Sequence, residues 1–88
     1  MRYIVDVSYR HASAYLTVTG ASSRLAERRA KRVGTVLRQK LPEATICAPR
    51  DRGYTDDGQV MYEVPILIEQ CGPKARSVLA QLFLKGSC

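Results

Sequence analysis

The sequence contains no tryptophan, one histidine and three cysteines, which leaves few side chains for metal or redox chemistry. The cysteines stand at positions 47, 71 and 88, so they do not form the Cys-x-x-Cys pair that zinc sites and thiol redox motifs use. An odd number of widely spaced cysteines also argues against a disulfide framework. We expect reduced thiols, with Cys47 and Cys71 partly buried, and neither a metal ion nor another cofactor.

Long hydrophobic runs are missing as well. No segment approaches the ~18 apolar residues that a membrane-spanning helix requires. The N-terminal residues from Met1 to Asp6 include an acid and lack the apolar stretch of a secretory signal. These two absences predict a cytoplasmic protein without a membrane partner.

The signatures of common enzyme classes are also absent. The six glycines form neither a phosphate-binding loop nor the Gly-x-Ser-x-Gly turn that carries a catalytic serine. His11 falls in an expected turn, and the sequence places no nucleophile beside it. Asp51, Asp56 and Asp57 are oxygen donors that suit a hard cation, but Asp-Asp-Gly is also a common turn sequence. The turn interpretation predicts a positive φ angle at Gly58, and we expect no catalytic residue and no bound metal.

Acidic residues are scarce relative to basic ones. Eight Asp and Glu residues face 14 Lys and Arg residues, which gives a formal net charge of +6 and a pI of about 9.6. Most of the cations are arginine, whose planar guanidinium binds phosphate and carboxylate groups through paired hydrogen bonds. The charge therefore predicts an anionic partner, either nucleic acid or an acidic protein surface. The alternative is that the excess charge only keeps the surface solvated.

Hydrophobic periodicity predicts six elements in a single domain spanning residues 1–88. Alternation at period two indicates strands at 2–9, 14–19 and 60–69, and a short strand is expected at 45–47. A 3.6-residue period indicates one helix from Ser22 or Ser23 to Leu41 and another beginning at Pro73. The order is strand, strand, helix, strand, strand, helix. It predicts an α+β two-layer sandwich, in which a four-stranded, mainly antiparallel sheet carries both helices on one face.

The alternation also assigns side chains to the two faces of the sheet. The positions expected on the helix side are Tyr3, Val5, Val7, Leu16, Val18, Ile46, Val60, Tyr62, Val64, Ile66 and Ile68. The positions expected on the opposite, open face are Ile4, Asp6, Tyr15, Thr17, Thr19, Met61, Glu63 and Leu67. The mixed composition of the open face suits a partner, and a homodimer through this face is one expectation. Pro65 has no N–H to donate, so the strand over 60–69 is expected to be at an edge or bulged.

Two segments concentrate the candidate binding residues. The first helix presents a row of cations opposite its apolar stripe: Arg24, Arg28, Lys31, Arg32 and Arg38. Glu27 is the only acid among them. Residues 49–59 are expected to form a long loop, in which Arg50, Arg52 and Tyr54 combine two cations with an aromatic ring. Such a combination is typical of proteins that hold single-stranded nucleic acid, although the acids in the same loop offset its charge.

No motif in the sequence identifies a protein family. The clustered aromatic residues of RNA-recognition sheets and the Gly-x-x-Gly loop of KH domains are absent, and a double-stranded RNA-binding domain would begin with a helix. The leading hypothesis is a non-enzymatic module that contacts nucleic acid, or a nucleic-acid-handling complex, through the basic helix. The alternative is a protein-binding inhibitor or adaptor that uses the open sheet face, the sheet edge or residues 49–59. Its size and charge also suit a phage-encoded inhibitor of a host defence complex.

Overall fold

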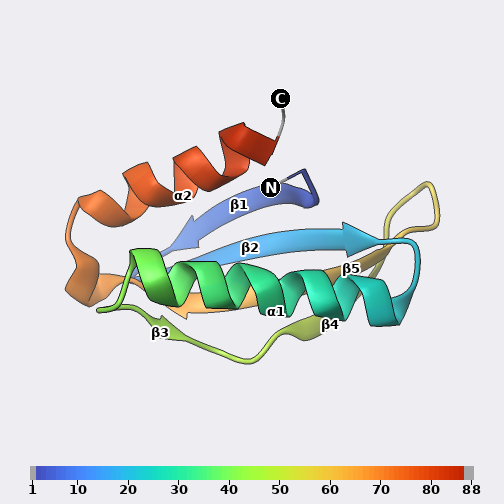
Figure 1. The fold of residues 1–88 in the computed structure, drawn as a ribbon, viewed down its shortest axis with the longest axis horizontal. Helices are drawn as coiled ribbons and strands as arrows, with labels where there is room; N and C mark the ends of the chain where they lie inside the picture. Colours follow the sequence, from blue (N-terminus) through green and yellow to red (C-terminus); the bar gives the residue numbers. More distant parts are fainter. Residues whose placement is uncertain (1, 87–88) are drawn as a thin grey trace.

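Two helices cover one face of an antiparallel sheet (Figure 1). The structure is a computed structural model that describes residues 2–86, with the side chains of residues 2–83. The strands are β1 (Ile4–Arg10), β2 (Ser13–Gly20), β3 (Thr45–Ile46), β4 (Arg50–Tyr54) and β5 (Val60–Leu67); the helices are α1 (Ser23–Lys40) and α2 (Lys74–Gly86), preceded by a 3-10 turn at Glu69–Cys71. The spatial order is β1-β2-β5, with β3 and β4 both paired to the outer side of β5. The predicted α+β class with a mainly antiparallel sheet is confirmed, although the sheet has five strands instead of four.

Helix α1 begins at the predicted cap. The Ser22 backbone is extended, and its Oγ accepts a hydrogen bond from the Leu25 N–H at 3.2 Å. The helix ends at Lys40, because Leu41 leaves helical geometry before Pro42. Helix α1 packs against β2 and β5, whereas α2 packs against β1.

Within residues 2–86, neither helix is both long enough and apolar enough to cross a bilayer.

The core fills the space between the sheet and the helices. Its largest fully buried side chains are Leu16, Leu37, Leu41, Ile66, Leu79, Val18, Val33 and Val64. Each such side chain stabilises the fold by roughly 1.5–3 kcal/mol relative to an exposed position. Gly20 is needed where β2 turns into α1, because an added Cβ would lie 2.6 Å from the Ala26 backbone nitrogen. Gly34, by contrast, faces Ile46 at an ordinary contact distance of 3.6 Å.

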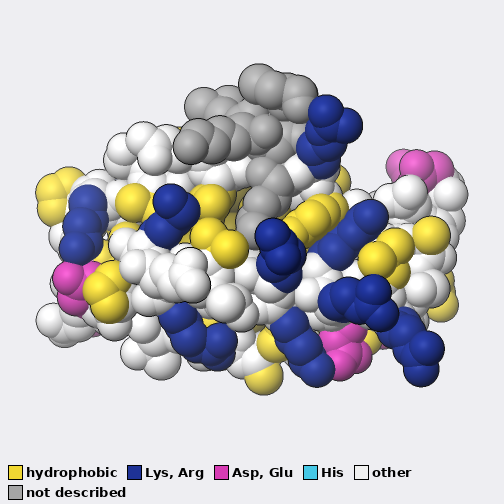
Figure 2. All heavy atoms as spheres, in the orientation of Figure 1, with side chains coloured by type: hydrophobic (Ala, Val, Ile, Leu, Met, Phe, Trp, Pro, Cys, Tyr) yellow, Lys and Arg dark blue, Asp and Glu magenta, His cyan; other side chains and the backbone are white. Residues whose placement is uncertain are grey.

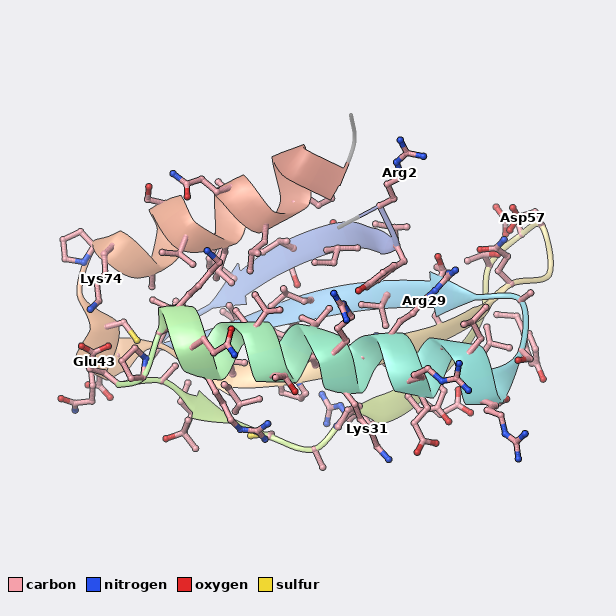
Figure 3. The ribbon with its side chains drawn as sticks, in the orientation of Figure 1. Arg2, Arg29, Lys31, Glu43, Asp57 and Lys74 are labelled. Atoms are coloured by element: carbon pink, nitrogen blue, oxygen red, sulfur yellow. The ribbon has the colours of Figure 1, made fainter. Side chains whose placement is uncertain are left out.

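A salt bridge joins the turn after α1 to the start of α2. Lys74 Nζ lies 2.9 Å from Glu43 Oε1, and the two side chains point toward each other in Figure 3. The hydrogen bond from Lys74 is the main reason that the pKa of the Glu43 carboxyl lies below its ordinary value.

A β-bulge reverses the predicted faces at the start of β1. Ile4 pairs with Val18, but the next pair in the ladder is Asp6 with Thr17, so Val5 is the extra residue. Ile4 is only 4% exposed in the core, whereas Val5 is 47% exposed. The prediction that Val5 faces the helices and Ile4 the open face is therefore wrong, because the extra residue shifts the alternation by one position.

Part of the predicted loop at 49–59 is a strand. Residues 50–54 form β4 and pair with β5, and a second bulge lies between Asp51 and Gly53. The bulge breaks the period-two pattern, and the segment is rich in charge, so its strand character is hidden in the sequence. The remaining residues form the predicted turn, in which Gly58 has the expected positive φ of 83° and donates to the Thr55 carbonyl at 3.0 Å.

Strand β5 is central and pairs with β2 without a register shift, so the prediction that it lies at an edge or is bulged at Pro65 is wrong. It pairs with β2 on one side and with β3 and β4 on the other. The Pro65 carbonyl accepts a hydrogen bond from the Cys47 N–H at 2.9 Å, so the Pro65 nitrogen, which has no hydrogen to donate, also points toward residues 47–49. The outer ladder is interrupted at these residues, and the ladder therefore needs no donor from Pro65 there.

Cys47 is exposed in this interruption and not partly buried as predicted. Cys71 is buried, and burial raises the pKa of its thiol; Cys88 lies outside the described residues.

Candidate functional site

The solvent side of α1 carries the five predicted cations in one row. Arg24, Arg28, Lys31, Arg32 and Arg38 are all exposed, and they are called here the basic helix surface. Positions 24 to 38 span about 21 Å at 1.5 Å per residue, and their spacing keeps the side chains on one side of the helix. In Figure 2, Lys and Arg side chains extend along the face of the molecule that carries α1, and few Asp or Glu side chains lie between them.

Most of this positive charge is not neutralised within the molecule. Lys31 Nζ lies 3.1 Å from Glu27 Oε1, and both side chains are exposed, so this ion pair is weak. Arg24, Arg28, Arg32 and Arg38 make no hydrogen bond or ion pair with any residue that the structure describes. The surface can therefore offer four complete guanidinium groups to an anion.

The surface is hollowed at two places. An open hollow of about 550 Å³ lies at the N-terminal half of α1, lined by Ser23, Arg24, Glu27, Arg28 and Lys31. A narrower groove of about 250 Å³ separates α1 from residues 46–49. Its floor includes Gly34, Ile46 and Val64, and Lys31 and Arg38 stand at its rim.

Arg29 belongs to the same helix but is engaged within the fold. Its Nη1 donates to the Thr19 carbonyl at 2.8 Å, and its guanidinium lies over the Tyr3 ring at 5.1 Å from the centroid. Figure 3 shows Arg29 directed toward β2, whereas Lys31 points to the other side of α1, away from β2. Arg29 therefore anchors α1 and is not part of the basic helix surface.

Arg50 and Arg52 lie on the opposite, open face of the sheet. Arg50 Nε and Nη2 donate to Glu63 Oε1 at 2.8 and 2.6 Å, and Arg52 Nε lies 3.6 Å from Glu63 Oε2. Tyr54 is 71% exposed at the end of β4. The eight predicted site residues thus do not form one site, because the sheet separates the basic helix surface from the two arginines of β4.

Sequence reasoning placed Glu63 on the open face but assigned it no role. Its pairing with β4 depends on a register that joins positions 13 residues apart, Arg50 and Glu63. The sequence signal that could have pointed to this arrangement is the alternation in β2 and β5, which predicts that Tyr15 and Glu63 lie on the same face of the sheet. In the part of the chain that the structure describes, no group of three His, Cys, Asp or Glu side chains is arranged to hold a metal ion.

No protein-family model matches this sequence, and comparisons with curated proteins and with solved structures give no match. Inference about function therefore rests on the two charged surfaces described above.

Proposed function

We propose that this protein is a non-enzymatic, cytoplasmic module that binds nucleic acid through the basic helix surface. The observation that carries the proposal is the row of four exposed arginines along α1, which lack a carboxylate partner among the described residues. Cations aligned in this way repel one another, and a polyanion removes that repulsion while releasing its own counterions.

The dimensions of the row suit a phosphate backbone. A length of about 21 Å at 1.5 Å per residue spans roughly 12 charges of a duplex, which carries one charge per ~1.7 Å of axis. Arginine can bind each phosphate through two parallel N–H groups. The hollow beside Arg24 and Arg28 leaves room for a backbone to approach the helix.

The salt dependence of binding tests this proposal. Fluorescence anisotropy would follow binding to labelled duplex and single-stranded oligonucleotides with 5′-hydroxyl ends, at several NaCl concentrations. Four phosphate contacts predict that log K falls with log [NaCl] at a slope of about −3.6 on duplex, and the Arg28→Gln or Arg32→Gln variant should reduce that slope by about 0.9.

The matched control is Arg10→Gln, which removes the same charge from the open face of the sheet. It should leave the slope on duplex unchanged, because Arg10 lies across the sheet from α1. If Arg10→Gln and Arg28→Gln weakened duplex binding equally, binding would depend only on the net charge of the protein, which would contradict the proposal. Absence of binding to either oligonucleotide at low salt would also contradict it.

An acidic protein surface is the alternative partner for the same arginines. In that case the protein would act as an inhibitor or adaptor, and its complex would survive nuclease treatment. A nuclease-treated pulldown, repeated with Arg28→Gln, distinguishes this alternative from direct binding to nucleic acid.

A further inference from the structure

A second cationic site lies on the open face of the sheet, away from α1 and α2. It is a hollow of about 230 Å³, called here the sheet-face pocket, and its lining comes from four strands: Ser8, Tyr9 and Arg10 of β1, Tyr15 of β2, Arg50 and Arg52 of β4, and Glu63 of β5. No helix of the described chain covers this face (Figure 1).

Glu63 is buried although it lies on this uncovered face. Its side chain is 9% exposed, because Arg50 and Arg52 lie over it. The shared carboxylate holds two guanidinium groups together that would otherwise repel each other. Arg50 and Arg52 are two residues apart and therefore share the open face of β4, so both reach the same glutamate.

The pocket keeps an excess of positive charge and of hydrogen-bond donors. One carboxylate balances one of the two β4 arginines, and Arg10 adds a third cation that has no ion-pair partner among the described residues. Arg50 uses Nε and Nη2 on Glu63, which leaves Nη1, and Arg52 uses only Nε. The hydroxyl groups of Ser8 and Tyr15 add two more donors to the lining.

We propose that the sheet-face pocket binds a phosphate group, either inorganic phosphate or the phosphomonoester of a nucleotide. A phosphate dianion matches the remaining charge, and its oxygens can accept from several N–H and O–H groups at once. Glu63 is a positioning residue that orients the two arginines and does not touch the ligand. This inference does not depend on nucleic-acid binding by α1, because the two sites lie on opposite sides of the sheet.

Titration of the 15N-labelled protein tests the proposal. Inorganic phosphate and a nucleoside 5′-monophosphate would each be added at constant ionic strength, with NaCl as the compensating salt. We expect saturable NMR shifts at the residues of the pocket and none along α1. Tighter binding of the monophosphate would identify an ester as the natural source, whereas equal binding of both would identify the phosphate group alone as the recognised chemistry.

Two variants make the test specific. Arg10→Gln should weaken phosphate binding about tenfold, as expected for the loss of one charge-assisted hydrogen bond, and it should unfold like the wild type because Arg10 does not contact Glu63. Arg28→Gln carries the same charge change on α1 and should bind phosphate like the wild type. Shifts that grow linearly without saturation, or an Arg10→Gln variant with undiminished affinity, would overturn the proposal. Neither result bears on the salt slope measured with duplex.

Discussion

The ion pair between Arg50 and Glu63 should hold β4 to the sheet, and a double-mutant cycle measures how strongly. The variants are Arg50→Gln, Glu63→Gln and the double substitution. The two hydrogen bonds are short, at 2.8 and 2.6 Å, but the partners differ in environment: the Glu63 side chain is 9% exposed and that of Arg50 is 58% exposed. Exposed pairs contribute about 0.2–1 kcal/mol, and breaking a fully buried pair costs about 3–5 kcal/mol.

Because only one partner is buried, we expect a coupling energy of about 1.5 kcal/mol, between these limits. The single variants should also differ in a defined order. Arg50→Gln leaves a buried carboxylate with only Arg52, 3.6 Å away, whereas Glu63→Gln leaves arginines that can turn toward water. Arg50→Gln should therefore destabilise the protein more than Glu63→Gln.

Equilibrium unfolding in urea is the appropriate assay, because urea is uncharged and does not screen the pair as guanidinium chloride would. With an m-value of about 1 kcal/mol/M, a loss of 1.5 kcal/mol lowers the midpoint by roughly 1.5 M. A coupling energy below about 0.3 kcal/mol would be indistinguishable from additivity and would refute the role of the pair. A larger loss in Glu63→Gln than in Arg50→Gln would refute the argument from burial.

Three further predictions concern stability and reactivity. Gly20→Ala should lower the unfolding free energy by about 2 kcal/mol, because its Cβ would meet α1 backbone at 2.6 Å, whereas Gly34→Ala should raise it by about 1 kcal/mol; urea unfolding measures both. The lowered pKa of Glu43 means that its pair with Lys74 stabilises the fold above the ordinary carboxyl pKa and stops doing so as the pH falls through the lowered value. Lys74→Gln should therefore raise the Glu43 pKa in an NMR titration and lose its stability difference from wild type in acid. Cys71 should resist iodoacetamide until urea unfolds the protein, as followed by peptide mapping, because burial raises its pKa.

Local patterns in the sequence predict most of the secondary structure. The cap at Ser22, the apolar stripe of α1 and the alternation in β2 and β5 each depend on neighbouring residues, and each is confirmed. The errors arise where one extra residue changes the register. The bulge at Val5 exchanges the predicted faces of Ile4 and Val5, and the bulge between Asp51 and Gly53 hides β4, because period-two analysis assumes an unbroken ladder.

The same distinction applies to the candidate sites. The exposed row on α1 follows from the helical period alone, so its residues could be listed before the fold was known. The cluster of Arg50, Arg52 and Glu63 requires the pairing of β4 with β5, and that pairing is decided by tertiary contacts. Sequence reasoning identified the two arginines but could not give them their carboxylate partner.

The bulges also affect how the sheet meets other molecules. Both outermost positions of the sheet are irregular, with Val5 interrupting one side, and residues 47–49 and Arg52 interrupting the other. On the β4 side, an extended chain from a neighbouring molecule would find few consecutive backbone groups in register. Strand β1 is regular from Asp6 to Arg10, and these two residues place charges along its border. We therefore expect the interrupted register on the β4 side, together with the charges of Asp6 and Arg10 on β1, to disfavour fibrillar aggregation through the sheet edges.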